Sequence, residues 1–417
     1  MLDLRAFRFL ASPDGRAILA QLASADLSDI NTLGLLSELR HRLPVEIAGA
    51  ALILARLRVR ATAKFSRADA MYFTPDALEQ ASGEIVGAWR ARRFAEYGFS
   101  RLADLGCGIG GDTLALAGTP GASVVALDRD PLRLEMAQAN LAAYGRAAHF
   151  VQADLTDPLP LAVRCIPAAF FDPARRDEGR RIFSVRDTSP PLGVIDRWPF
   201  RALAVKLSPG VDLNELRPYT DAGAGVEFVS LGGELKEAVL WCGDWAFVGQ
   251  RASRLEPDGA GETLIPAQVP APELSTPRAY LYEPDPAVIR AGLLGELAVR
   301  LDTDLFRLDE SIAYLTGDTS VPSVWARMWP IWDWMPFSLK RLRSLLAAHG
   351  IGQVTVKKRG SPITPETLIA RLKLKGEGNP AVVVLTQIAG QHSVILCGPM
   401  LEQGPAAQPC TRSILPC

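Results

Sequence analysis

Helical periodicity dominates the first part of the chain. Apolar residues recur there at intervals of three and four positions, as in Leu19, Leu22 and Ala23 and again in Leu33, Leu36, Leu39 and Leu43. This spacing puts apolar side chains on one face of a helix. We therefore predict a helical cap over residues 1–62 that packs on the domain behind it and carries no chemistry of its own.

From residue 63 to about residue 250 the pattern changes. Short apolar runs alternate with helical stretches, which indicates βαβ units and a parallel sheet. The runs are Arg101–Leu105, Ser123–Leu127, His149–Val151, Ala168–Phe171, Ala202–Leu207, Glu227–Leu231 and Glu237–Trp241. The last two are separated by a short segment with Gly232-Gly233, too short for a helix, so they are expected to form an antiparallel pair at one sheet edge.

The rest of the chain divides at a stretch rich in Pro, Gly, Ala and Ser. Residues 251–277 have this composition and are predicted to be a linker. A second αβ domain is expected over 278–400, with helices at 286–300 and 339–349 and strands at 353–357, 381–387 and 393–396. Residues 401–417 are expected to be a loose tail.

Composition limits the function classes. The 417 residues include 48% hydrophobic and 22% charged residues and carry a formal net charge of -1, so nucleic-acid binding would need local patches. Six cysteines without a CxxC pair and only 4 histidines argue against a metal site or a disulfide framework, and favour the cytoplasm. The start of the chain lacks a signal-peptide pattern, and the apolar stretch 47–57 is too short to span a bilayer, so no membrane association is expected.

A glycine-rich loop is the strongest chemical motif. It lies in Leu102–Thr113 (LADLGCGIGGDT), where an apolar strand leads into glycines and then a helix. Glycines 106, 108 and 111 fit the dinucleotide pattern G-x-G-x-x-G, whereas Asp104, Gly106, Gly108 and Gly110 fit acid-x-Gly-x-Gly-x-Gly. A carboxylate at the strand end suits the ammonium of an amino acid better than a pyrophosphate. Asp104 therefore favours S-adenosylmethionine over a dinucleotide.

Two further acids follow neighbouring strands. Asp128 ends the run SVVALD, 22 residues after Gly106, where an acid reaches the ribose hydroxyls of an adenosine cofactor. Its alternative role is a helix cap, for which Asp130 is better placed. Asp154 is either a contact for the adenine amino group or a cap.

The run Phe170–Arg176 (FFDPARR) follows the fourth strand, where open α/β sheets place reacting groups. Asp172-Pro173 predicts a stiff turn whose oxygens accept a hydrogen bond from a substrate amine. Arg175 is a candidate for holding a phosphate or carboxylate. Lys206, at the end of the fifth strand, is expected either to face the same cleft or to form an ion pair with Asp172 or Glu234.

These motifs, in the order DLGCGIGGDT, ALDRDP, QADL, FFDPARR and KLSPG, resemble the class I S-adenosylmethionine-dependent methyltransferases. Together with the segments 64–81 and 280–287, they resemble more narrowly a bacterial subgroup that has a C-terminal THUMP-like domain. The resemblance implies a Rossmann-like, seven-stranded α/β sheet with a reversed last strand. It also implies cofactor contacts from Asp104, Gly106, Gly108, Gly110, Asp112, Asp128 and Asp154, with Phe73 and Thr74 closing over the cofactor.

The resemblance further implies a structured RNA substrate, tRNA or rRNA, and catalytic roles for Asp172, Pro173, Arg175 and Lys206. One departure concerns the acceptor. Related amino-directed enzymes carry Pro and an aromatic ring after Asp-Pro, whereas this chain has Ala174 and Arg175. Arg175 or Phe200 is the candidate for stacking on the base. A pyrimidine C5 target is disfavoured because neither FFDPARR nor KLSPG contains a cysteine nucleophile.

Three hypotheses follow. The first is an enzyme that methylates a nitrogen of an RNA base, supported by the basic stretch 340–375, in which Glu366 is the single acid. The second is a methyltransferase for a small molecule or protein, whose C-terminal domain serves assembly. The third is a non-catalytic RNA-binding protein, which the acids at 104, 128, 154 and 172 disfavour. The tryptophans at 325, 329, 332 and 334 are expected in a core or a domain interface.

Overall fold

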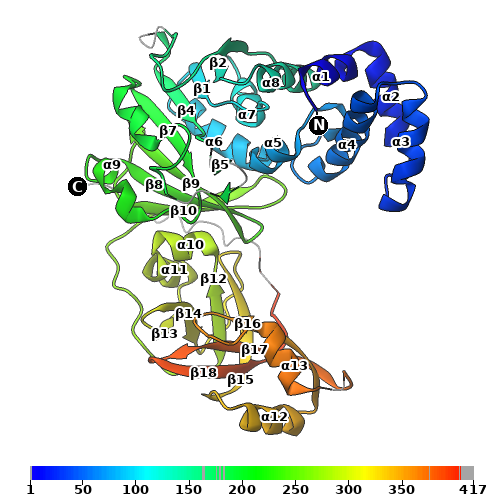
Figure 1. The fold of residues 1–417 in the computed structure, drawn as a ribbon. Coiled ribbons are helices and arrows are strands. Elements are labelled where there is room, and N and C mark those ends of the chain that lie inside the picture. Colours follow the sequence, from blue (N-terminus) through cyan, green and yellow to red (C-terminus); the bar gives the residue numbers. More distant parts are fainter. Residues whose placement is uncertain are drawn as a thin grey trace. The chain divides into compact units, whose positions relative to one another are not determined.

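The computed structural model describes residues 2–161, 165–174, 176–177, 180–181, 184–374, 376–402 and 404. The described residues form two compact units (Figure 1). Of the described residues, the first unit contains those within Met1–Val229, Lys236–Gly249 and Leu255–Gly261. The second unit contains those within Ser230–Leu235, Gln250–Arg254 and Glu262–Cys417. The expected tail, 401–417, lies almost entirely outside the described residues.

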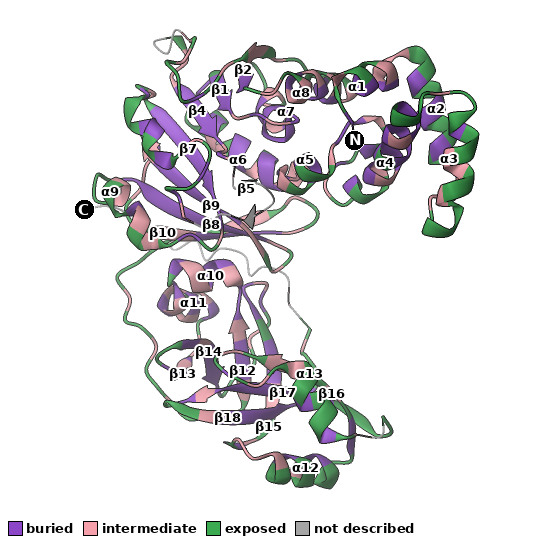
Figure 2. Cartoon of the chain, viewed as in Figure 1, coloured by how far each residue is buried: buried purple, intermediate pink, exposed green. Residues whose placement is uncertain are grey.

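The N-terminal residues are helical, as predicted. Helices α1 (Leu4–Ala11), α2 (Pro13–Ala23), α3 (Thr32–Arg40) and α4 (Val45–Ala61) share one hydrophobic core with Phe73 and with Met136 of α8 (Pro131–Ala143). The buried residues of α4 occupy most of its length, in agreement with its apolar sequence. The helical cap and the sheet domain are therefore parts of the same unit. Figure 2 shows α3 largely exposed and the central strands buried.

A nine-stranded sheet is built around the predicted α/β core, in the order β11-β10-β8-β9-β7-β4-β1-β2-β3. Strands β1, β2, β3, β4 and β7 are mutually parallel, and β9 runs antiparallel to β7. The seven strands from β8 to β3 give the expected sheet with its reversed strand. Their bounds are β1 (Arg101–Leu105), β2 (Ser123–Asp128), β3 (His149–Gln152), β4 (Ala168–Phe171), β7 (Ala202–Leu207), β8 (Gly225–Leu231) and β9 (Glu234–Gly243).

Two expectations about the end of this sheet are corrected. The β8–β9 hairpin is not at the sheet edge, and residues 251–277 are only partly a linker, because β10 (Gln250–Leu255) and β11 (Gly261–Leu264) extend the sheet beyond β8. The composition of β10 gave little sign of a strand because two of its four buried residues, Ser253 and Arg254, are polar or charged. Such burial requires partners, and Asp285 provides one for Arg254, with Nη1 and Oδ2 2.7 Å apart.

The second unit contains a seven-stranded sheet in the order β13-β14-β12-β15-β18-β17-β16. Alternate residues of β17 face two different cores: Val383 and Leu385 pack with Leu342 and Leu368 of α12 and α13, whereas Val384 packs with Trp329. The predicted strands near 353, 381 and 393 are confirmed. The bounds are β12 (Tyr280–Pro284), β13 (Phe306–Asp309), β14 (Ile312–Gly317), β15 (Ala326–Pro336), β16 (Ile351–Lys358), β17 (Asn379–Ile388), β18 (Gln391–Cys397), α12 (Leu339–Ala348) and α13 (Pro365–Leu372).

Two sequence-based details of this unit change. The helix expected at 286–300 is two helices, α10 (Pro286–Ala291) and α11 (Leu294–Leu301), because Gly292 takes a φ of 71° and ends the first one. The tryptophans lie on or beside a strand. Trp325 and Trp329 are buried, as expected, but Trp332 is 41% exposed.

The remaining elements connect these parts. They are η1 (Asp29–Asn31), η2 (Ala68–Ala70), α5 (Pro75–Gln80), α6 (Glu84–Glu96), α7 (Gly111–Ala117), β5 (Arg176–Asp177), β6 (Arg180–Arg181), η4 (Leu192–Arg197), η5 (Leu213–Leu216) and α9 (Arg217–Thr220). Among the described residues, no helix combines the length and the apolar content needed to cross a membrane.

Candidate functional site

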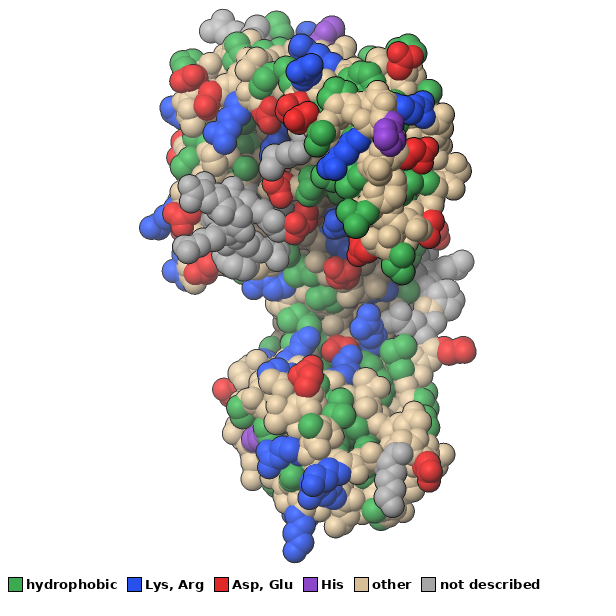
Figure 3. Space-filling model, turned by 45° about the vertical axis from the view of Figure 1, so that its right-hand side comes forward, with side chains coloured by type: hydrophobic (Ala, Val, Ile, Leu, Met, Phe, Trp, Pro, Cys, Tyr) green, Lys and Arg blue, Asp and Glu red, His purple; other side chains and the backbone are tan. Residues whose placement is uncertain are grey.

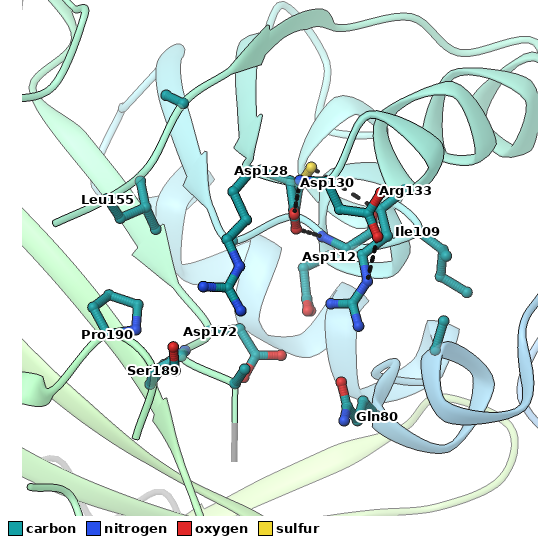
Figure 4. Close-up of a pocket in the computed structure, with 18 of the residues that line it drawn as sticks. Gln80, Ile109, Asp112, Asp128, Asp130, Arg133, Leu155, Asp172, Ser189 and Pro190 are labelled. Atoms are coloured by element: carbon teal, nitrogen blue, oxygen red, sulfur yellow. Dashed lines mark hydrogen bonds and ion pairs between the residues drawn. The ribbon is translucent and has the colours of Figure 1, made fainter. Parts of the chain in front are cut away.

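A cavity opens at the carboxyl ends of the parallel strands in the first unit (Figure 4). Its lining residues come from the loop after β1, from the segments after β2, β3 and β4, and from α5. Among the predicted site residues, those that line it are Gly106, Gly108, Asp112, Asp128, Asp154, Asp172 and Pro173. The carboxyl edge of an open α/β sheet is the usual place for a ligand, so the strand-end acids are brought together as expected.

Close backbone packing explains Gly106. Its φ is 81°, and a Cβ there would come within 2.8 Å of the carbonyl oxygen of Asp172. The Gly106 and Cys107 N–H groups both donate to the Leu127 carbonyl at 2.9 Å. The loop after β1 is thus held against β2 and against the end of β4, and only glycine allows both contacts.

The next glycines have different roles. A Cβ on Gly108 would meet no atom within 4 Å, so the loop leaves open space at this point of the cavity. Gly110 does not line the cavity; it has a φ of 84° and lies against Ala137 of α8, where a Cβ would come within 3.0 Å. Gly110 therefore shapes the entry to α7.

Asp104 lies below the loop and not on the cavity wall. The residue is fully buried. Thr113 Oγ1 donates to its Oδ2 at 2.5 Å, and its Oδ1 has no hydrogen-bond partner. Burial, reinforced by the nearby Asp112 carboxylate, raises the pKa of Asp104 to about 8. A cation brought near this carboxyl group would stabilise its ionised form.

A buried ionic network supports Asp112. Arg90 of α6 lies 2.6 Å from Asp112 and 2.7 Å from Glu237 of β9, and Ser82 donates to Asp112 at 3.1 Å. Burial alone would raise the pKa of Asp112, but the Arg90 guanidinium and Lys206 hold it below its ordinary value. Arg90 also covers the ring of Phe170. The sequence did not point to Arg90, since a single arginine in an amphipathic helix gives no sign that it is buried.

The acids after β2 and β3 are both engaged by the backbone. Asp128 accepts from the N–H of Gly108 at 2.9 Å and from the N–H of Asp130, also at 2.9 Å. Asp130 caps α8, as its sequence position suggested. Asp154 is exposed on the cavity rim, and hydrogen bonds from the Thr156 N–H and hydroxyl lower its pKa. Each acid is thus oriented before any ligand is present.

Asp172 and Lys206 form the ion pair that the sequence left open. Lys206 Nζ lies 2.7 Å from Asp172 Oδ2 and also donates to the Gln80 carbonyl at 3.3 Å. The Lys206 side chain is 4% exposed and that of Asp172 is 19% exposed. Figure 4 shows Asp172 beside the cavity, across from Gln80 of α5. The lysine therefore fixes the carboxylate at the end of β4.

Phe73 and Thr74 are the residues expected to close over the cofactor. Neither belongs to the described residues that line the cavity. Phe73 is completely buried in the core shared with the N-terminal helices, and Thr74 caps α5 by accepting from the Ala77 N–H. Helix α5 itself contributes Ala77 and Gln80 to the wall. Lys64 holds its last turn by donating to three carbonyls, those of Leu78, Glu79 and Ala81.

The structure describes one of the two candidates for stacking on a base. Arg175 lies outside the described residues. Phe200 precedes β7 at the amino end of the parallel strands, where it contacts Trp198, whereas the cavity is at the carboxyl end. Phe200 is thus at the wrong end of the sheet, since strand direction, not sequence distance, decides which side chains share an edge.

The residues present fit S-adenosylmethionine. Asp104 offers a buried oxygen without a partner, Gly108 leaves an open cradle, and Asp128 is an oriented carboxylate at the end of β2. In the part of the chain that is described, no group of three or more His, Cys, Asp or Glu side chains could hold a metal ion.

Comparison with family models agrees with this geometry. A methyltransferase domain matches residues 102–172, which include the glycine loop and Asp172. A THUMP domain-like model matches residues 326–399 in the second unit. A domain of unknown function matches residues 3–61.

Whole-chain relatives extend the comparison. An uncharacterized S-adenosylmethionine-dependent methyltransferase from Mycobacterium tuberculosis is 36% identical over 320 residues, which are 76% of this chain and 84% of the relative; the protein is present in two strains with the same values. The crystal structure of a putative methyltransferase from Porphyromonas gingivalis superposes with a TM-score of 0.70 at 22% identity, over 93% of this chain and 98% of that one, and shows the same fold. The chain therefore belongs to the S-adenosylmethionine-dependent methyltransferases and uses S-adenosylmethionine as its cofactor.

Proposed function

We propose that the chain methylates a nitrogen of a base in structured RNA, either tRNA or rRNA. The observation that carries this proposal is the position of Asp172-Pro173. The turn lines the same cavity as Gly106, Gly108 and Asp128, and Lys206 holds the Asp172 carboxylate at 2.7 Å. An acceptor placed at this turn is next to the residues that fit the cofactor.

The chemistry of this turn suits an amine. S-adenosylmethionine supplies an electrophilic methyl group when it is bound. Lys206 occupies Asp172 Oδ2, which leaves Oδ1 to accept a hydrogen bond from an acceptor N–H. This hydrogen bond orients the nitrogen lone pair toward the methyl carbon. The nitrogen forms the new bond to carbon while the carbon–sulfur bond breaks, and the nitrogen proton passes to Asp172 or to water.

Cofactor contacts are proposed for the acids beneath and beside the loop. Asp104 interacts with the ammonium of the amino-acid end, and its raised pKa then falls. Asp128 has lone pairs left after its two backbone hydrogen bonds and accepts from the ribose hydroxyls. Asp154 faces the adenine. Asp112, in its ion pair with Arg90, positions the start of α7.

The RNA part of the proposal is supported by the second unit. It matches a THUMP domain-like model, and exposed basic side chains lie on α12 and near α13. These are Lys340, Arg341, Arg343, Lys358, Arg371 and Lys373. In Figure 3, several Lys and Arg side chains lie together at the end of this unit where Figure 1 places α12. Such a patch neutralises phosphates even in a chain whose formal net charge is -1.

One observation favours a second candidate, a methyltransferase for a small molecule or protein. Among the described residues that line the cavity there is no aromatic ring, and the sequence position where a stacking ring is expected holds Arg175. Binding to total tRNA across a salt series separates the candidates, since an RNA enzyme loses affinity steeply with salt.

The acceptor is identified by mass spectrometry of nucleosides from cells with the gene, without it, and complemented with Asp172→Asn. We expect one methylated nucleoside to be lost without the gene and to stay absent in the Asp172→Asn cells. An unchanged set of nucleosides, together with no tRNA binding at low salt, would exclude the RNA proposal.

A further inference from the structure

A second cavity lies entirely among residues of the second unit. Its wall combines the β8–β9 turn, through Gly233, with Arg254 of β10, Arg327 of β15 and Arg359 just after β16. None of these residues takes part in the site at the carboxyl ends of the first sheet. Three arginines thus line one cavity.

Two of the guanidinium groups converge on one point. A Cβ on Gly233 would come within 3.1 Å of Arg327 Nη2 and within 3.3 Å of Arg254 Nη1. Gly233 has a φ of 80° and no side chain, which lets both guanidinium groups pack closely against its backbone. Arg254 is 5% exposed and its Nη1 is paired with Asp285, while Arg327 is exposed.

The charges around the cavity do not balance. Asp285 is paired with Arg254 at 2.7 Å, and Glu283 is paired with Lys357 at 2.6 Å and lies 4.0 Å from Arg359. Arg327 stands opposite Glu283 in the β12–β15 register, yet the described residues give it no ion pair. The two carboxylates are thus already engaged, and the cationic charge exceeds the anionic charge.

We propose that this cavity binds a phosphate group, with Arg327 and Arg254 as its principal donors and Arg359 as a further cation at its wall. Guanidinium groups match phosphate oxygens with two parallel hydrogen bonds, and an anion relieves the repulsion between cations held close together. The phosphate belongs to the backbone of the RNA substrate, a step that rests on the proposed function. The cavity then fixes the position of the RNA and takes no part in methyl transfer.

The test compares the full-length protein with Arg327→Gln, Arg327→Lys and a control, Arg40→Gln, which removes one exposed charge from the end of α3. Affinity for total tRNA is measured between about 50 and 300 mM salt. We expect Arg327→Gln to bind about five- to ten-fold more weakly, with the salt slope reduced by about 1, and Arg327→Lys to recover part of the loss. Affinity for S-adenosylhomocysteine and the melting temperature should not change, since Arg327 is exposed.

In parallel, the protein is titrated with inorganic phosphate alone, and its melting temperature is measured at each concentration. This titration shows whether the ligand is a free phosphate or a phosphate of the RNA backbone. Equal tRNA binding by Arg327→Gln and wild type would overturn the phosphate site while leaving the RNA enzyme intact. If wild type binds neither tRNA nor rRNA, but phosphate stabilises wild type and not Arg327→Gln, the cavity holds a free phosphate and the RNA proposal fails. An equal loss of tRNA affinity in Arg40→Gln would show that the affinity depends only on the overall charge of the protein. This result would also overturn the phosphate site.

Discussion

Lys206 Nζ lies 2.7 Å from Asp172 Oδ2, and this ion pair joins the end of β7 to the end of β4 beside the cavity. The pair is partly shielded, because the Lys206 side chain is 4% exposed. It leaves the second oxygen of Asp172 available for an acceptor. The arrangement fixes a carboxylate where a methyl acceptor is expected.

Asp172→Asn should therefore separate catalysis from cofactor binding. The amide keeps the shape of the side chain and an oxygen that can accept the acceptor N–H, but it loses the negative charge that pairs with Lys206 and takes up the nitrogen proton. We expect methyl transfer to fall by about 100-fold or more, while affinity for S-adenosylhomocysteine stays within about three-fold. Single-turnover transfer of labelled methyl groups and calorimetry measure the two effects. Full activity in the variant would place the acceptor elsewhere.

Asp104→Asn should change how stability depends on pH. The folded pKa of Asp104 is about 8, above the value of about 4 expected in an unfolded chain. The native state thus holds the proton more tightly. The protonated carboxyl group contributes its full stabilisation below about pH 4, and this contribution is lost as pH rises toward 8, by on the order of 1 kcal/mol per pH unit.

Asparagine does not titrate, so Asp104→Asn should reduce the fall in the free energy of unfolding across this pH window. Denaturant melts at several pH values measure it, with Asp154→Asn as the control, because that carboxyl group is exposed and its pKa is lowered. The same slope in Asp104→Asn and wild type would show that Asp104 is ionised in the free protein.

Gly106→Ala and Gly108→Ala form a matched pair. Both glycines have positive φ, but a Cβ at Gly106 would meet the Asp172 carbonyl at 2.8 Å, whereas one at Gly108 would meet nothing within 4 Å. We expect Gly106→Ala to lower stability by about 2–4 kcal/mol and Gly108→Ala by about 1 kcal/mol. Gly108→Ala should instead weaken cofactor binding, because its methyl group fills the cradle. Equal melting temperatures would contradict the close approach at Gly106.

Local sequence patterns predicted the sheet and the strand-end acids well. Each of these features is defined by residues that are neighbours in sequence: the glycines directly follow strand β1, and the acids stand at the ends of β2 and β4. Parallel strands then bring their carboxyl ends to one edge of the sheet. The pattern could not show Arg90, because its burial depends on Asp112 and Glu237, which are distant in sequence. It also missed β10, where Arg254 is buried and pairs with Asp285, which is distant in sequence.

Phe200 shows the other limit of sequence reasoning. It is one of the two candidates for stacking on the base, but the start of β7 lies at the opposite end of the sheet from the cavity. Phe73 gives a related example. It precedes the helix that lines the cavity, yet its ring packs toward Phe65 and the N-terminal helices. Side-chain direction depends on packing between distant segments, which a single sequence does not display.

The most direct test of the central claim is calorimetry of S-adenosylhomocysteine binding in two buffers of different ionisation enthalpy, at about pH 6.5. With Asp104 protonated in the free protein and the ligand amine already charged, we predict tight binding with release of about one proton, and weaker binding of Asp104→Asn without proton release. Tight binding with no proton release from wild type, or unchanged affinity in Asp104→Asn, would contradict the claim that Asp104 interacts with the amino-acid end of the cofactor.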